Sequence, residues 1–197
     1  MPRRTVEFER GGYYHIYNRG AGRRSIFLNQ ENYRFALELI NRYLAPLHLT
    51  MIAYCLLPNH YHWLVRQDGE AKAGLLAQRV FNAYSKAFNN SNDRSGTLFE
   101  DRYAAIAVTS NEYLRHLCRY IHANPVRHGI ATAVELWPYS NYLEWIEQRP
   151  RNLVDRAFVQ AHFPAPEQYQ AYVASYVSEQ VKLPDGLAAY LEELETG

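Results

Sequence analysis

Four segments of the chain have the residue pattern of β-strands, and the first of them alternates between hydrophobic and polar residues. The segments are 13–19 (YYHIYNR), 48–57 (HLTMIAYCLL), 60–67 (HYHWLVRQ) and a stretch near RYAAIAV within 97–108. A period of two is typical of a strand that buries one face. The dipeptide Pro58-Asn59 between the second and third segments is a tight-turn signal. These two strands are therefore expected to form a hairpin.

Hydrophobic residues at helical spacing mark three further segments. The predicted helices cover about 30–45, 73–89 and 110–124. Asn29 or Asn32 is expected to cap the first helix, and Pro46 to end it. A Thr-Ser pair followed by Glu112 is expected to start the third helix. Pro125 is expected to interrupt that helix, because proline lacks the backbone N–H and clashes with the preceding turn.

The order of these elements, β-α-β-β-α-β-α, predicts an α+β fold whose first six elements are ferredoxin-like. In that arrangement one antiparallel sheet carries helices on one face, and the other face is left free for a ligand. We assign residues 1–130 to this domain. Residues 131–197 are expected to form an acidic helical extension packed on it, with breaks at Pro150, Pro164–Pro166 and Pro184.

The net charge of +1 conceals an uneven distribution of charge along the chain. Residues 1–130 carry 17 Lys and Arg against 10 Asp and Glu, whereas residues 131–197 carry 4 against 10. Fifteen of the 17 cations are arginines, which favour bidentate contacts with phosphate. The first part therefore has the charge expected for nucleic-acid binding. An ordinary solvated surface is the alternative.

Several features favour a cytoplasmic protein. Cys55 and Cys118 are too few for a disulfide framework, and their spacing fits no zinc motif. The charged start MPRRTVEFERGG lacks the apolar region of a signal peptide. No segment approaches 18 consecutive apolar residues, so no membrane span is expected.

His60 and His62 form an H-x-H pair in the third predicted strand. Residues i and i+2 of a strand share a face and lie roughly 7 Å apart. Two neutral imidazoles in this position can converge on one metal ion. The alternative is that both histidines are incidental to any site.

Tyr120 and Asn124 lie four residues apart in the third predicted helix, so they share a face of it. A tyrosine can act as a nucleophile when a base or positive charge assists it. An Asn carbonyl is a suitable ligand for a hard metal ion. The alternative is a core tyrosine followed by a helix-end cap.

Several motifs in order resemble the REP-associated tyrosine transposases, a family of the HUH single-strand transposase superfamily. The motifs are YHIYNRG, LLPNHYHWLV, FNAYSKAFNN, TLFEDRY, RYIHANPVRHGI and WPYSNY. The resemblance spans about residues 12–145.

The resemblance implies a metal-dependent enzyme. His60 and His62 match the family's metal-binding histidine pair, with Tyr61 between them, and Tyr120 matches its catalytic tyrosine. Asn124 falls where relatives carry a polar third ligand, often Gln. The implied ion is Mg²⁺ or Mn²⁺.

The resemblance also implies the activity: cutting and rejoining single-stranded DNA at REP-like hairpins through a 5′-phosphotyrosine. The chain is expected to act as a monomer or a homodimer. The basic residues expected to contact DNA are Arg19, Arg23, Arg24, Arg79, Lys86 and Arg102.

Two alternatives remain: a non-catalytic, domesticated nucleic-acid binder and a zinc-dependent hydrolase using His60 and His62. Of the other histidines, His15 on the first strand could face the site, and His116, four residues before Tyr120, could act as its proton partner. His122, two residues after Tyr120, is expected to point away from it.

Overall fold

A computed structural model of the chain describes residues 6–150 and 153–178. Within these ranges four strands form one antiparallel sheet in the order β2-β3-β1-β4. The strands are β1 (Tyr13–Arg19), β2 (Leu49–Leu57), β3 (His60–Gln67) and β4 (Ala104–Val108). The hairpin and the ferredoxin-like sheet predicted from the sequence are both confirmed.

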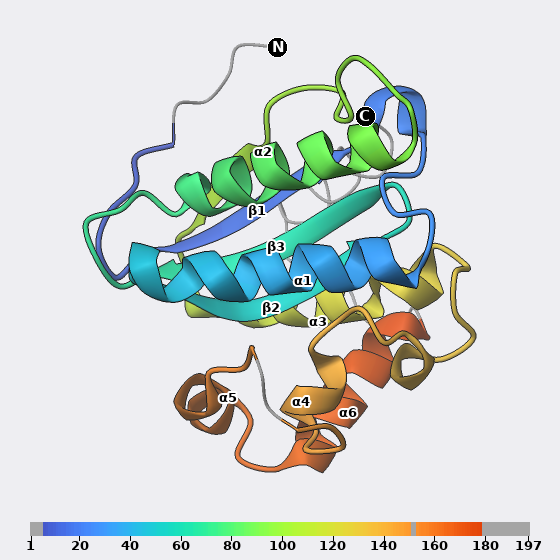
Figure 1. Cartoon of the computed structure of the whole chain (residues 1–197). Helices are drawn as coiled ribbons and strands as arrows, with labels where there is room; N and C mark the ends of the chain where they lie inside the picture. Colours follow the sequence, from blue (N-terminus) through green and yellow to red (C-terminus); the bar gives the residue numbers. More distant parts are fainter. Residues whose placement is uncertain (1–5, 151–152, 179–197) are drawn as a thin grey trace.

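Helices α1 (Gln30–Leu44) and α2 (Gly74–Ser91) lie side by side across one face of the sheet (Figure 1). Asn29 is the N-cap of α1, because its side chain accepts a hydrogen bond from the backbone N–H of Asn32. The side chain of Asn32 in turn accepts from the N–H of Leu28 at 2.9 Å. Both candidate caps therefore act at the start of α1.

Strand alternation divides the buried side chains between the two faces of the sheet. Tyr14 and Ile16 of β1, with Tyr61, Trp63 and Val65 of β3, belong to the core beneath α1 and α2. The residues between them point to the opposite face. The two histidines of β3 and the single histidine of β1 therefore share this second face.

Helix α3 (Asn111–Arg127) packs on the second face and runs behind the sheet in Figure 1. Its residues Leu117, Cys118 and Ile121 join one core with Cys55 and Leu57 of β2. The prediction that this face is free is therefore wrong where α3 covers it. Helix α3 follows the six ferredoxin-like elements and has a hydrophobic side of its own. It buries this side against the second face of the sheet.

The predicted end of this helix at about residue 124 is also wrong, because α3 continues through Pro125. The backbone N–H of His128 donates to the carbonyl of Asn124 at 3.0 Å. The N–H of Gly129 donates to Val126 at 2.9 Å and that of Ile130 to Pro125 at 2.8 Å. These bonds satisfy the carbonyls of the last turn, so the N–H that Pro125 lacks does not end the helix there.

Residues beyond 130 pack against the edge of β2 and against α3. The helices there are α4 (Tyr142–Trp145), α5 (Arg156–His162) and α6 (Pro166–Val177), grouped beyond β2 in Figure 1. Ser140 forms an antiparallel bridge with Cys55, so residues 139–141 cover the edge of β2. Pro150 and Pro164 lie between helices, and Pro166 is the first residue of α6. Pro184 lies outside the described residues.

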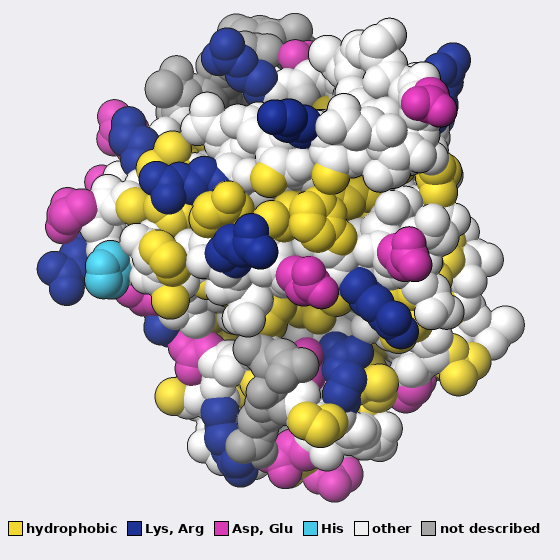
Figure 2. Space-filling view, in the orientation of Figure 1, with side chains coloured by type: hydrophobic (Ala, Val, Ile, Leu, Met, Phe, Trp, Pro, Cys, Tyr) yellow, Lys and Arg dark blue, Asp and Glu magenta, His cyan; other side chains and the backbone are white. Residues whose placement is uncertain are grey.

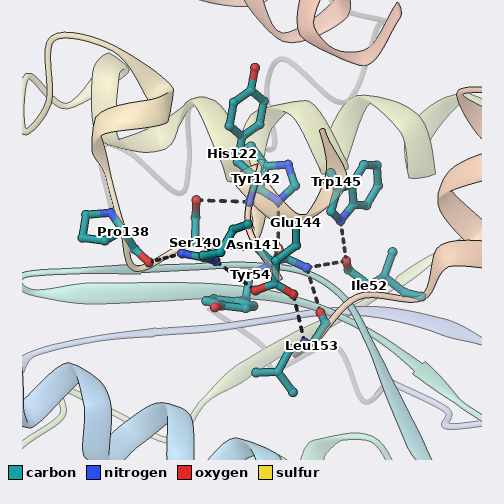
Figure 3. Close-up of polar contacts among 11 residues, drawn as sticks. Ile52, Tyr54, His122, Pro138, Ser140, Asn141, Tyr142, Glu144, Trp145 and Leu153 are labelled. Atoms are coloured by element: carbon teal, nitrogen blue, oxygen red, sulfur yellow. Dashed lines mark hydrogen bonds and ion pairs between the residues drawn. The ribbon is translucent and has the colours of Figure 1, made fainter. Parts of the chain in front are cut away.

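Asn141 is the centre of the contact between this region and β2 (Figure 3). Its Oδ1 accepts from the N–H of Tyr54 at 2.8 Å, and its Nδ2 donates to the carbonyls of Ile52 and Leu153. The Nε2 of His122 on α3 lies 2.8 Å from the same Oδ1. One buried amide thus joins α3, β2 and the segment after α4.

Arginines of α3 stack on tyrosines of α6. The guanidinium of Arg119 lies 4.3 Å from the ring centre of Tyr172 and 5.1 Å from that of Tyr176. Arg127 lies 4.8 Å from the ring of Tyr176. These cation–π contacts hold the two helices together.

A domain boundary at residue 130 stays a prediction. None of the described helices combines the length and apolar character that crossing a membrane requires.

Candidate active site

Strands β1 and β3 place a row of polar and aromatic side chains on the second face of the sheet. Tyr17 is the direct partner of His62, and Arg19 is the direct partner of His60. The rings of His60 and His62 lie 5.1 Å apart, centre to centre, at an angle of 84°. The histidine pair predicted from the sequence therefore does share a face of β3.

The hydrogen bond of His60 defines which of its nitrogens carries the proton. Its Nδ1 lies 2.7 Å from Oδ1 of Asn59. The amide of Asn59 is oriented by its other end, because Nδ2 donates to the carbonyl of Arg23 at 3.2 Å. Since an amide oxygen accepts only, Nδ1 of His60 is the donor. The neutral ring then presents the lone pair of Nε2, which suits metal binding.

Both histidines are neutral at physiological pH. Burial, with smaller contributions from nearby His128 and Arg19, lowers the pKa of His60 to about 3. Burial also places the pKa of His62 well below its ordinary value, with a further contribution from His60. Desolvation disfavours the charged imidazolium. A neutral imidazole is the form that binds metal ions.

Tyr120 of α3 faces the histidine pair. Its ring centre lies 5.4 Å from that of His62, with the two planes at 78°. It also lies 6.4 Å from the ring of His15 on β1. Tyr120 is 1% exposed. The predicted nucleophile and the predicted metal-binding pair are therefore brought together by the fold.

One face of α3 follows the histidine pair from end to end. Tyr120, Asn124 and His128 are spaced by four residues, so they lie one above another on the helix. Tyr120 contacts His62, and His128 lies 5.1 Å from His60. Asn124 is the residue between these two contacts. Its position on α3 is therefore next to the pair, as the predicted third ligand requires.

The side chain of Asn124 provides an oxygen that can act as an acceptor or a metal ligand. Its Nδ2 donates to the carbonyl of Tyr120 at 3.0 Å, which fixes the orientation of the amide. Its Oδ1 is buried and has no hydrogen-bond partner among the described residues. Such an atom costs stability in the free protein. A divalent cation of the hard type would satisfy this oxygen.

Residues 6–150 and 153–178 contain no group of three His, Cys, Asp or Glu side chains placed to hold a metal ion. The donors that fit an ion are therefore the imidazoles of His60 and His62 and the amide oxygen of Asn124. Catalytic zinc sites take three ligands from His, Cys and acidic residues. Within the part of the chain that the structure describes, this set lacks the third such ligand.

The predicted DNA-binding basic residues fall into two groups, of which the first lies at the His60 end of the sheet. Arg19 pairs with Glu100 through Nε and a terminal nitrogen, at 3.1 and 3.0 Å. Arg23 and Arg24 are exposed in the loop after β1, and Arg102 is exposed before β4.

Backbone bonds hold these loops in place. The N–H of Gly20 donates to Asn59 at 2.7 Å, and that of Ala21 donates to Leu98 at 3.0 Å. Any side chain at Gly20 would clash with the carbonyl of Arg24. The loop after β1 is thus tied both to the hairpin turn and to the segment before β4.

The second group, Arg79 and Lys86, lies exposed on α2. This helix covers the opposite face of the sheet from the histidine pair. Figure 2 shows the face formed by α1 and α2, where basic side chains are scattered with acidic ones between them. The structure therefore does not bring Arg79 and Lys86 together with the site. Tyr84 of the same helix is a core residue.

Two histidines at the site received no role from the sequence. His15 is buried beside His62. The sequence indicated that β1 pairs with β3 in a ferredoxin-like sheet, and this pairing could have predicted that His15 lies near the histidine pair. His128, the C-cap of α3, was missed because the helix was expected to end near residue 124. His116 instead contacts Arg119 and Glu112, and His122 points into the core, as expected.

Comparison with known families agrees with this geometry. The family model described as Transposase IS200 like matches residues 10–124, a segment that begins before β1 and ends at Asn124. This match covers more than half of the chain. The chain belongs to the IS200-like transposase family.

Two known proteins are similar over most of the chain. A protein of Haemophilus influenzae named as a putative REP-associated tyrosine transposase is 24% identical over 153 residues, which are 69% of this chain and 82% of the relative. A solved structure of a REP-associated tyrosine transposase bound to a REP hairpin superposes with a TM-score of 0.63 at 20% identity, covering 79% of this chain and 94% of that one. The second similarity supports the fold.

Proposed function

We propose that this protein is a metal-dependent endonuclease and strand transferase for single-stranded DNA. It cuts and rejoins hairpin DNA of the REP type through a phosphotyrosine on Tyr120. Membership of the IS200-like transposases supports the reaction class. The relative's name and the hairpin bound in the similar structure support the substrate.

The observation that carries this proposal is the contact of Tyr120 with His62 from two separate elements. A core tyrosine would not need around it two neutral histidines and an amide oxygen that has no partner among the described residues. Asn124, one turn beyond Tyr120, supplies that oxygen. Nucleophile and metal donors therefore lie on facing surfaces of α3 and β3.

His60, His62 and Asn124 are the residues that would hold the ion. When bound, a divalent ion neutralises charge on the phosphate oxygens and polarises the phosphodiester. Imidazole ligands also suit transition metals, so we expect Mn²⁺ to support activity as well as Mg²⁺. Burial keeps both histidines neutral and ready to coordinate.

Tyr120 supplies the nucleophilic oxygen. Its phenol loses a proton, its oxygen forms a bond to phosphorus, and the bond from phosphorus to the 3′-oxygen breaks. The departing 3′-oxygen takes up a proton and becomes a free hydroxyl. One phosphodiester replaces another, so rejoining by a 3′-hydroxyl reverses the same steps and needs no nucleotide cofactor. Since Tyr120 is 1% exposed, we expect substrate binding to open the contact between α3 and β3.

The nucleophile acts in cis in this proposal. Tyr120 meets His62 of its own chain, and the Arg119–Tyr172 and Arg127–Tyr176 contacts hold α3 against α6. A monomer is then sufficient for cleavage.

DNA reaches the site across the His60 end of the sheet. Arg19, Arg23, Arg24 and Arg102 lie on the loops that meet there. Arginine forks fit phosphate groups, and partly exposed Tyr17 offers a ring beside His62 for a base to stack on.

The two alternatives are less well supported. A zinc hydrolase needs a third strong ligand, and the described residues hold no such set. A non-catalytic binder requires neither the neutral histidine pair nor the orphan oxygen of Asn124.

The proposal is tested with end-labelled single-stranded hairpin DNA, Mn²⁺ and the full chain on a denaturing gel. We expect cleavage with a protein-linked product, lost in Tyr120→Phe and reduced about 10³-fold in His62→Gln, since the ion contributes several kcal/mol to the transition state. Binding without cleavage by the wild type would support the non-catalytic alternative.

A further inference from the structure

His15 is a buried histidine that the proposed reaction does not use. It lies on β1 with 0% exposure, beside His62 with 4%. The Nε2 of His15 is 3.0 Å from Nδ1 of His62, and the rings stack at 24° with their centres 5.2 Å apart. This distance is that of a hydrogen bond between two imidazoles.

Two neutral imidazoles can share this hydrogen bond in two directions. A neutral imidazole carries one proton, on either Nδ1 or Nε2. If Nε2 of His15 donates, His62 carries its proton on Nε2 and has no lone pair there. If Nδ1 of His62 donates, Nε2 of His62 is left with a lone pair.

His60 shows the second arrangement, in which Nδ1 donates the hydrogen bond and Nε2 keeps its lone pair. The Nδ1 of His60 donates to the amide oxygen of Asn59, which leaves Nε2 of His60 with its lone pair. Two metal ligands on one strand need equivalent tautomers if both rings are to coordinate through the same nitrogen. Nε2 of His15 lies at hydrogen-bond distance from Nδ1 of His62, in the same way that the amide oxygen of Asn59 lies at Nδ1 of His60.

We propose that His15 is a positioning residue that accepts a hydrogen bond from Nδ1 of His62 and thereby holds Nε2 of His62 ready to coordinate a divalent ion. This inference rests on the proposed function, because it concerns the same metal site. Partners of this kind orient ligating histidines, and their loss typically costs about 10- to 100-fold in metal affinity. His15 does not touch the ion or the DNA in this role.

The bond direction can be measured directly in the wild-type protein without metal. Long-range ¹H–¹⁵N correlation spectra of ¹⁵N-histidine-labelled protein distinguish the two tautomers, with His62→Gln assigning the signals. We expect His62 to carry its proton on Nδ1. A proton on Nε2 of His62 would overturn the inference.

Metal affinity gives a second readout. Binding of Mn²⁺ alone, measured by calorimetry, is expected to weaken about 10- to 100-fold in His15→Leu. It should weaken less in His15→Gln, whose side-chain oxygen can accept the same bond. His122→Gln is the matched control, because His122 is also fully buried but bonds to Tyr169 and Asn141 instead. We expect the control to keep the wild-type affinity.

The outcomes separate this inference from the function on which it rests. Equal Mn²⁺ affinity in the wild type and in folded His15→Leu would overturn the role of His15 alone. An absence of Mn²⁺ binding by the wild type would overturn both the role of His15 and the proposed metal site. If His15→Leu does not fold, the wild-type tautomer and the affinity of His15→Gln decide the question.

Discussion

The ring of Tyr120 meets the ring of His62 edge to face, with centres 5.4 Å apart and planes at 78°. The two residues come from α3 and β3, which face each other across the second side of the sheet. Asn124 lies one turn further along α3, and His128, the C-cap of this helix, contacts His60. This relationship makes α3 the helix that sets the geometry of the proposed reaction.

Asn124→Leu should separate stability from metal binding. The substitution removes a buried oxygen without a described partner and one hydrogen bond to the carbonyl of Tyr120. These effects oppose each other, so we expect the metal-free unfolding free energy to change by less than about 1 kcal/mol. Addition of Mn²⁺ should raise the unfolding temperature of the wild type and leave that of the variant unchanged. An equal rise in both proteins would remove Asn124 from the metal site.

The salt dependence of DNA binding should locate the DNA path. Removing one phosphate-binding cation lowers the slope of log affinity against log salt by about 0.7 on single-stranded DNA. We expect this decrease for Arg23→Ala and for Arg102→Ala. The matched controls Arg79→Ala and Lys86→Ala, on α2, should keep the wild-type slope. An equal decrease in the α2 variants would instead indicate that DNA crosses the opposite face.

His122 should make stability depend on pH. Burial lowers its pKa to about 4, against 6.5 in an unfolded chain, so the unfolded state binds more protons between these values. The unfolding free energy should therefore fall as pH falls below about 6.5, by about 2 kcal/mol at pH 5 for this group. His122→Gln should show a shallower decrease in urea titrations at pH 7.5 and 5. Parallel decreases in the two proteins would contradict the assignment.

Asn141→Leu should strongly destabilise the fold. It would leave the N–H of Tyr54, the carbonyls of Ile52 and Leu153, and Nε2 of His122 without their buried partner. We expect a loss of about 3–5 kcal/mol in urea unfolding. Asn92→Ala, which removes one bond from an exposed asparagine, should cost about 0.5 kcal/mol or less. A small effect at Asn141 would show that it does not hold the C-terminal region on β2.

The sequence was sufficient to predict the sheet and the pair His60–His62, because alternation determines which side chains of a strand share a face. Tyr120 and Asn124 were placed together by helical spacing. These predictions depend on local geometry, which the residue pattern encodes directly.

The features that were missed depend on how elements pack. The prediction that α3 ends before Pro125 follows from the missing N–H of proline, but bonds from His128, Gly129 and Ile130 complete the last turn. That extension brings His128 to His60. The hydrogen bond between His15 and His62 depends on the register of β1 on β3, which the sequence does not define. The position of residues 139–141 on the edge of β2 depends on the buried contacts of Asn141 with β2.

The most direct test of the account is the identification of the DNA-linked residue by mass spectrometry. The full chain is incubated with single-stranded hairpin DNA and Mn²⁺, then treated with nuclease and protease. We predict a nucleotide phosphate attached to the peptide that contains Tyr120, and its absence from Tyr120→Phe. DNA cleavage that leaves every tyrosine unmodified, or attachment to another residue, would contradict the account.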